Sequence, residues 1–160
     1  MSGQNKSNPS ERPQRKRPSH GVLNVPATPT VVFITFCTQN RVKALANNNV
    51  HTTMQQIWRD ADRWRVGRYI LMPDHVHHFA SPAHNQTTLD SWVTYCKSMV
   101  SRTLIARNFC CQAGHWDTRM RSAEQYETKW EYVRHNAVRH GLVQRAADWP
   151  YQGTIFDLAW

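Results

Sequence analysis

The sequence has no long apolar segment. None of its 160 residues lies in an unbroken apolar run of the roughly 18 residues that a membrane-spanning helix needs, and the first residues lack the apolar core of a secretory signal. We therefore expect no membrane association and a cytoplasmic location.

Cysteine is also scarce, and its spacing excludes a disulfide framework. Cys37, Cys96, Cys110 and Cys111 contain no Cys-x-x-Cys pair, and two adjacent cysteines bridge with difficulty. Cys110, Cys111 and His115 would give zinc three ligands without a fourth at the usual spacing. We expect reduced, mostly buried thiols and no zinc site.

Acidic residues are few relative to basic ones. The chain has 11 Asp and Glu against 20 Lys and Arg, which gives a formal net charge of +9, and nine histidines can add positive charge below neutral pH. Such an excess favours polyanionic partners, of which nucleic acid is the first to consider. A basic surface that is merely solvated is the alternative.

Residues 1–29 contain almost no large apolar side chains and are rich in proline, serine, amides and basic residues. Such a segment cannot bury enough surface to offset the entropy of ordering. We expect a flexible basic arm, either inert or in contact with DNA. Residues 30–160 then form a single domain, a length that suits one hydrophobic core.

Apolar periodicity divides this domain into strands and helices. Strands, the last of them short or a loop, are expected at Val31–Phe36, Val66–Met72, His75–Ser81 and His115–Arg119. Helices are expected at about residues 50–63, 89–107 and 123–140. This order, with a hairpin in the middle, predicts an α+β sandwich with helices packed on a mostly antiparallel sheet.

Capping residues mark the ends of two of these helices. Asn49 can cap the start of the first, and Ser122 with Gln125 forms a capping box before the third. Gly141 suits the left-handed residue that ends a helix. The third helix is therefore expected to run unbroken to about residue 140.

Two histidines share one face of the strand that follows the turn Pro73-Asp74. Side chains alternate along a strand, so His75 and His77 project together while Val76 and His78 face the other way. Two imidazoles on one face can share a divalent cation, although two ordinary polar strand residues would give the same pattern. His78 is expected to be a core or edge histidine.

The third helix separates an apolar stripe from a polar face. The stripe consists of Tyr126, Trp130, Val133 and Ala137. Tyr132 lies off the stripe, with Asn136 one turn and Arg139 two turns beyond it. Tyr132 is either an aromatic packing residue or a nucleophile, which needs its proton removed or a cation to stabilise the developing charge. The amide oxygen of Asn136 could help to hold a hard ion such as Mg²⁺ or Mn²⁺.

Three segments carry a resemblance to a known family: Met72-Pro-Asp-His-Val-His77, Tyr132-Val-Arg-His-Asn136 and Val138-Arg-His-Gly-Leu-Val143. They resemble the REP-associated tyrosine transposases, which are HUH endonucleases, and the similarity extends from about Val31 to the C-terminus. It implies a ferredoxin-like domain in a bacterial cytoplasm or nucleoid. It also implies DNA transposition, by cleavage and rejoining of single-stranded DNA next to hairpins (repetitive extragenic palindromes) through a 5′-phosphotyrosine intermediate.

Matched by position, the resemblance implies that His75 and His77 bind a divalent metal, Mg²⁺ or Mn²⁺, with Asn136 as the third ligand. It implies that Tyr132 is the nucleophile. The chain departs from the family at Ala137, where proline is usual, and at His78, where an apolar residue is usual. Neither change removes a catalytic group.

Basic and aromatic residues outside this set are expected to contact single-stranded DNA: Lys97, Arg102, Trp116, Arg134 and Arg139. Trp116, like Trp92, could instead be a core residue. The protein is expected to act as a monomer or a homodimer. The alternatives are a hairpin-DNA-binding relic that does not cleave, and a His-His metal hydrolase that activates water.

Overall fold

The computed structural model describes residues 30–83, 87–103 and 110–159. The predicted arm at 1–29 and the predicted end of the second helix beyond Thr103 lie outside these residues. The elements in chain order are β1 (Val31–Cys37), η1 (Gln39–Arg41), α1 (Asn48–Asp60), β2 (Trp64–Leu71), β3 (His75–Pro82), α2 (Leu89–Thr103), β4 (Trp116–Met120), α3 (Ala123–Arg134), α4 (Asn136–Arg139), η3 (Ala146–Asp148) and β5 (Gln152–Thr154).

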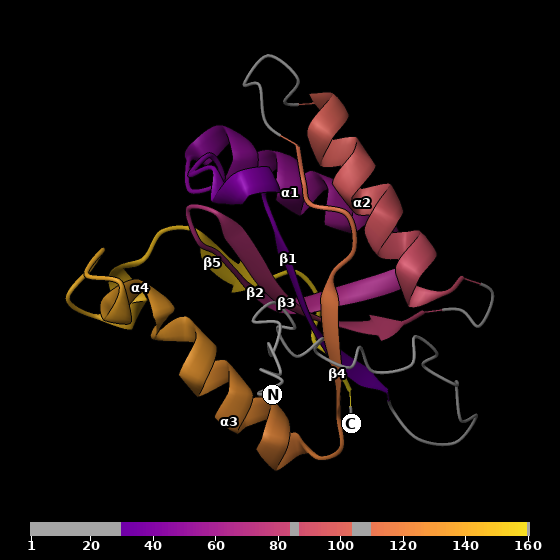
Figure 1. The fold of residues 1–160 in the computed structure, drawn as a ribbon. Coiled ribbons are helices and arrows are strands. Elements are labelled where there is room, and N and C mark those ends of the chain that lie inside the picture. Colours follow the sequence, from indigo (N-terminus) through magenta and orange to yellow (C-terminus); the bar gives the residue numbers. More distant parts are fainter. Residues whose placement is uncertain (1–29, 84–86, 104–109, 160) are drawn as a thin grey trace, which may run out of the picture.

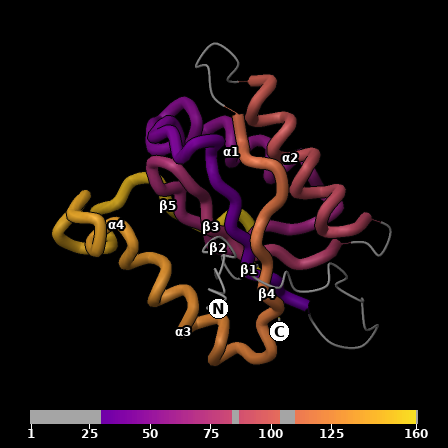
Figure 2. Tube along the Cα trace, in the orientation of Figure 1, coloured from indigo at the N-terminus to yellow at the C-terminus, as the bar shows by residue number. Residues whose placement is uncertain are grey.

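A five-stranded antiparallel sheet forms the middle layer, in the order β4-β1-β3-β2-β5. Helices α1 and α2 cover one face and α3 covers the other (Figure 1), and the chain trace shows the same layers (Figure 2). The predicted α+β sandwich is therefore confirmed. Because β3 lies between β1 and β2, side chains on β3 are supported by a neighbouring strand on each side.

Each face of the sheet carries its own apolar core, because side chains alternate along the strands. On β3, Val76 and Ala80 belong to the core under α1 and α2, whereas Phe79 packs in the core under α3. By the same alternation His75 and His77 point to the α3 side. The predicted common face of these two histidines is thus the face that α3 covers.

Helix α1 begins earlier than predicted, because the cap is Asn47 and not Asn49. The side-chain oxygen of Asn47 accepts a hydrogen bond from the backbone of Val50, 3.1 Å away. The helix also ends at Asp60, three residues before the predicted end. Strand β5 was not predicted, since three residues are too few to show periodicity.

The predicted unbroken helix at 123–140 is wrong, because the backbone leaves helical geometry at His135, with φ −82° and ψ 1°. The chain resumes as the short helix α4. Ser122 caps α3 as predicted, but the Gln125 side chain accepts from the Arg121 backbone and not from that of Ser122. Gly141 has the predicted left-handed backbone, with φ 68°.

The four cysteines are free thiols, of which Cys37 and Cys96 are buried and Cys110 is exposed. Cys111 is partly buried, so the thiols are mostly buried as expected, with Cys110 as the exception. Among the described residues, no helix is both long and apolar enough to cross a membrane.

His78 is a core residue, as predicted, and it is an unusual one. Its ring is 1% exposed and lies among Trp58, Trp92 and Phe36. Neither ring nitrogen has a hydrogen-bond partner among the described residues. Burial lowers the pKa of His78 to about 3. The neutral imidazole therefore occupies a position suited to an apolar side chain.

Replacing His78 by leucine should stabilise the fold by about 1–2 kcal/mol at neutral pH, because it removes unpartnered nitrogens from the core. In wild type, the unfolded chain takes up a proton at this histidine below about pH 6.5, whereas the folded chain does not until its lower pKa. Wild-type stability therefore falls as pH drops through that window, and His78→Leu should reduce the fall. Urea unfolding at about pH 7 and about pH 5 measures both effects. An unchanged pH slope would contradict the prediction.

Candidate active site

The predicted histidine pair forms a compact unit on β3. The ring centroids of His75 and His77 are 4.7 Å apart and the rings are nearly perpendicular, at 76°. His75 is 8% exposed, so the pair is set into the surface and not held out on flexible side chains. This arrangement brings two imidazoles close enough to share a small ligand.

The Nδ1 atom of each imidazole has a hydrogen-bond partner. His75 Nδ1 donates to Asp74 Oδ1 at 2.7 Å, and since a carboxylate only accepts, Nε2 of His75 keeps a free lone pair. His77 Nδ1 lies 2.6 Å from Oγ1 of Thr35, its direct cross-strand neighbour on β1. Histidines that bind metals typically engage their second nitrogen in this way. With His77 Nδ1 as the donor to the Thr35 hydroxyl, both Nε2 atoms carry a lone pair, and the residues present fit a metal held by these two atoms.

The electrostatic surroundings favour the neutral, metal-binding form of both rings. Burial lowers the pKa of His77 to about 3, and the neighbouring histidines and Lys129 act in the same direction. Burial also lowers the pKa of His75, against the opposing effect of Asp74. Near neutral pH neither imidazole carries a charge that would repel a cation.

Tyr132 lies on the same flank of the molecule as the histidine pair. Its side chain is 62% exposed on α3, and the guanidinium of Arg139 stacks 4.1 Å from its ring centroid. Lys129 Nζ lies 5.9 Å from this ring and 5.0 Å from the ring of Phe33. Phe33 in turn stacks on His77, with centroids 5.3 Å apart. Phe33 and Lys129 thus connect the tyrosine to the histidines.

Asn136 is buried at the start of α4, where its side-chain oxygen accepts a hydrogen bond from Arg139. Arg139 also donates to the backbone oxygen of Tyr132 at 2.7 Å. The oxygen predicted as a metal ligand is therefore engaged by a guanidinium, which must move before that oxygen can bind a cation. Within residues 30–83, 87–103 and 110–159, no group of three or more His, Cys, Asp or Glu side chains is arranged to hold a metal.

Sequence reasoning missed the residues that hold the histidines and bridge to the tyrosine. Asp74 lies within the Met72–His77 motif, where Pro73-Asp74 predicts a turn and gives no sign that the carboxylate meets His75. Thr35 and Lys129 carried no local signal, because each is placed by tertiary contacts. Thr35, for example, meets a histidine 42 residues away.

The structure places two of the predicted DNA contacts near the histidines. Trp116 pairs with Thr35 across β4 and β1, and directly opposed residues project from the same face of a sheet. Its side chain is 56% exposed, so it is available to a ligand and is not a core residue. Arg139 lies against Tyr132. Trp92, in contrast, is a buried residue of α2, in the core on the opposite face of the sheet.

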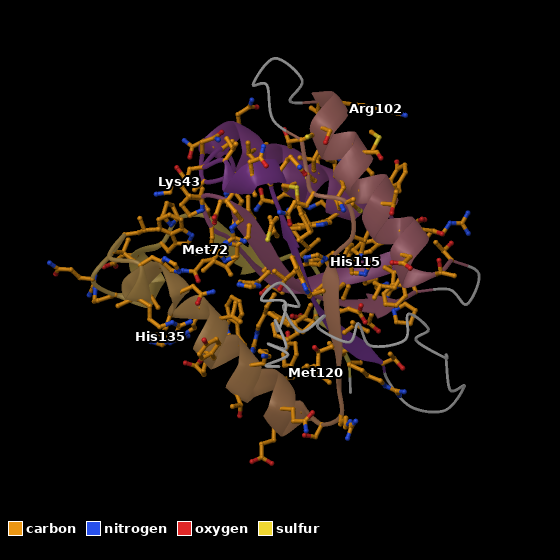
Figure 3. All side chains as sticks on the ribbon, viewed as in Figure 1. Lys43, Met72, Arg102, His115, Met120 and His135 are labelled. Atoms are coloured by element: carbon orange, nitrogen blue, oxygen red, sulfur yellow. The ribbon has the colours of Figure 1, made fainter. Side chains whose placement is uncertain are left out.

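Three other predicted DNA contacts have different surroundings. Lys97 is partly buried and donates to the backbone of Gly114 at 2.7 Å. Arg102 lies on the other side of the molecule from α3 (Figure 3). Arg134 pairs with Glu131 at 3.2 Å and faces a small pocket beside Trp130.

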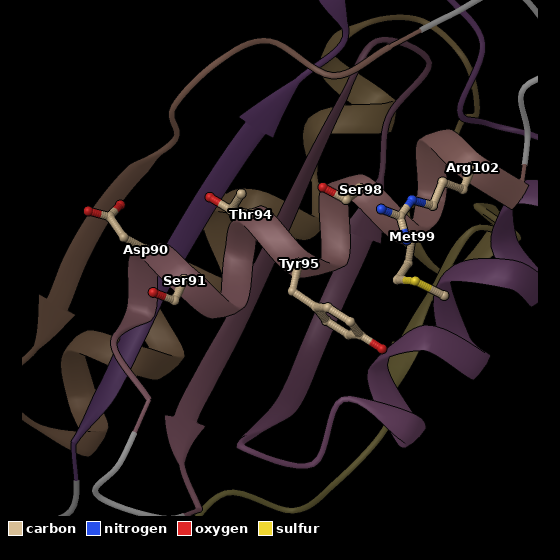
Figure 4. Close-up of a pocket in the computed structure, with 7 residues that line it drawn as sticks. All are labelled: Asp90, Ser91, Thr94, Tyr95, Ser98, Met99 and Arg102. Atoms are coloured by element: carbon tan, nitrogen blue, oxygen red, sulfur yellow. The ribbon is translucent and has the colours of Figure 1, made fainter.

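Arg102 belongs to an open groove on the outer surface of α2 (Figure 4). The groove is lined by Asp90, Ser91, Thr94, Tyr95, Ser98, Met99 and Arg102. It contains one acidic and one basic residue, so it has no excess of positive charge for a phosphate backbone. The prediction that Arg102 contacts DNA gains no support from this position.

Comparison with known proteins finds relatives by sequence, although no protein-family model matches the chain. A REP-associated tyrosine transposase of Escherichia coli is 25% identical over 115 residues, which cover 68% of this chain and 69% of the relative. A candidate REP-associated tyrosine transposase of Haemophilus influenzae is 22% identical over 141 residues, covering 79% of this chain and 80% of the relative.

Solved structures share the fold. A REP-associated tyrosine transposase bound to a REP hairpin superposes with a TM-score of 0.64 at 17% identity, covering 82% of this chain and 89% of that structure. A candidate transposase from Deinococcus radiodurans gives a TM-score of 0.50 at 15% identity, with 68% and 91% covered. Sequence relatives and fold together confirm the predicted resemblance: this chain is a homologue of the REP-associated tyrosine transposases.

Proposed function

We propose that this protein cleaves and rejoins single-stranded DNA next to hairpins, as a metal-dependent transposase that uses Tyr132. The observation that carries the proposal is the histidine pair, in which Nδ1 of each ring has a hydrogen-bond partner, so that Nε2 of each ring can bind a cation when Nδ1 is the donor. Its homologues are transposases, and one of the similar structures is bound to a hairpin. Hairpin DNA is accordingly the proposed partner of this chain.

In the proposed reaction, the Tyr132 hydroxyl attacks the phosphorus of a phosphodiester. An O–P bond to the tyrosine forms and the bond from phosphorus to the 3′ oxygen breaks. The phenolic proton passes to solvent, and the departing oxygen takes up a proton to become a 3′-hydroxyl. Attack of a 3′-hydroxyl on the phosphotyrosine reverses these changes and rejoins the strand, so no external energy source is required.

The side chains around Tyr132 have separate parts in this reaction. His75 and His77, with Asn136 once Arg139 has moved, would hold Mg²⁺ or Mn²⁺, which supplies positive charge at the scissile phosphate. Before that movement, Arg139 stacks on the tyrosine ring. The exposed ring of Trp116 and the partly buried Lys129 are suited to a base and a phosphate of a single strand.

The test uses a pool of single strands that carry a hairpin with randomised flanks, incubated with the full chain and Mn²⁺ or Mg²⁺. After denaturation, a 3′-end label should remain on the protein, whereas a 5′-end label should leave as a shorter strand with a free 3′-hydroxyl. Sequencing the captured strands identifies the preferred site. A chelator should abolish both products.

Other outcomes of this assay would overturn the proposal. Tight hairpin binding without cleavage would favour a relic that only binds DNA. Metal-dependent cleavage that leaves no label on the protein would favour a hydrolase that activates water.

A further inference from the structure

The turn that follows β1 has a strained backbone at a residue with a long side chain. Asn40 and Arg41 both have positive φ, 55° and 57°, and they are the non-glycine residues of the described chain that do so. Asparagine tolerates this conformation well, but arginine adopts it rarely. Such a conformation persists where surrounding contacts impose it, and it often marks a functional position.

Hydrogen bonds within the turn, and between the turn and Asp74, hold this backbone conformation in place. The Thr38 backbone N–H donates to the Asp74 backbone oxygen at 2.9 Å, and the Thr38 hydroxyl lies 2.8 Å from the Val42 oxygen. The Arg41 backbone N–H donates to the Thr38 oxygen at 3.2 Å. The turn therefore closes around Asp74 and directs the Arg41 side chain at it.

Arg41 pairs with the oxygen of the Asp74 carboxylate that does not bind His75. Arg41 Nε lies 2.8 Å from Asp74 Oδ2, and Arg41 Nη1 donates to Cys37 Sγ at 2.7 Å. The other oxygen, Asp74 Oδ1, accepts from His75 Nδ1 at 2.7 Å. With both oxygens engaged, the carboxylate cannot rotate about its own bond without breaking one contact.

We propose that Arg41 is a positioning residue of the metal centre, acting through Asp74 to hold the His75 ring with Nε2 directed at a divalent cation. The proposal rests on the proposed function. His77 needs no such relay, because the Thr35 hydroxyl meets its Nδ1 directly from the neighbouring strand. β1 and its turn would then orient both ligands, one by direct contact and the other through a carboxylate.

Binding of Mn²⁺ alone to the full chain tests this directly, by calorimetry or by loss of the free-ion electron paramagnetic resonance signal. Arg41→Met keeps the length of the side chain and removes its donors, and it should weaken Mn²⁺ binding roughly tenfold or more. Arg41→Lys retains the charge but cannot bridge Asp74 and Cys37 together. It should therefore weaken Mn²⁺ binding less than Arg41→Met does. Arg41→Lys also serves if Arg41→Met does not fold.

Arg145→Met is the matched control. Arg145 also binds both carboxylate oxygens of an aspartate, Asp148, at 3.0 and 2.8 Å. This pair lies at η3, away from the β1 turn that holds Arg41. Its removal should leave Mn²⁺ affinity unchanged. Thermal melting of both variants shows whether a loss of affinity exceeds any general loss of stability.

A double-mutant cycle with Asp74→Asn separates positioning from a structural role. If Arg41 acts through the carboxylate, Arg41→Met should weaken Mn²⁺ binding in wild type but add little in the Asp74→Asn background. Equal losses in both backgrounds, or no loss in wild type, would overturn the proposal while leaving the adduct assay positive. A wild-type chain that neither binds Mn²⁺ nor forms an adduct would overturn the proposed function and this inference together.

Discussion

Replacing Tyr132 by phenylalanine should abolish the covalent protein–DNA adduct and reduce strand cleavage by at least about a thousandfold, equivalent to about 4 kcal/mol of transition-state stabilisation. The change removes only the hydroxyl that would attack phosphorus. Phenylalanine keeps the ring against which Arg139 stacks. Because the side chain is 62% exposed, the fold should not change measurably. Single-turnover cleavage of end-labelled hairpin strands measures the effect.

Tyr95→Phe is the control for this prediction. Tyr95 is also an exposed tyrosine on a helix, 49% accessible, but it lies in the groove on the outer surface of α2. Its substitution should leave both adduct and rate unchanged. Adduct formation by Tyr132→Phe at the wild-type rate would show that another residue is the nucleophile, and cleavage without adduct would point to water.

Replacing His77 by alanine should remove metal-dependent cleavage, with a loss of at least about a hundredfold, or about 3 kcal/mol of transition-state stabilisation. One imidazole of the pair then remains, and a single neutral nitrogen holds Mg²⁺ or Mn²⁺ weakly. Hairpin binding in the presence of chelator should persist, since the positive charge of the surface is unaltered. Mn²⁺ titration, cleavage and gel-shift measurements on the same variant separate these effects.

His51→Ala is a matched control, because it also removes an imidazole that is hydrogen-bonded to a hydroxyl group. Its Nε2 lies 2.8 Å from the Tyr69 hydroxyl, much as His77 Nδ1 meets Thr35, but His51 belongs to α1, which packs on the other face of the sheet. The His51→Ala protein should bind Mn²⁺ and cleave as wild type does. Normal cleavage by His77→Ala would refute the metal assignment.

Local sequence patterns predicted much of the fold and part of the candidate site. Alternation along a strand placed His75 and His77 on one face, since this depends only on their spacing. Helical spacing separated Tyr132 from the buried stripe of α3, and its exposure agrees with that prediction. The prediction of an uninterrupted third helix was wrong, because a change of one ψ angle at His135 leaves no signature in apolar periodicity.

What the sequence by itself determined was therefore the set of chemical groups and the faces on which they lie, because both follow from backbone geometry over a few residues. Only the tertiary structure decided what holds those groups in place. Thr35 meets His77, and Arg41 meets Asp74, through the register of β1 against β3 and the turn that follows it. Such contacts join segments far apart in the chain, and local periodicity carries no information about which distant residues will meet.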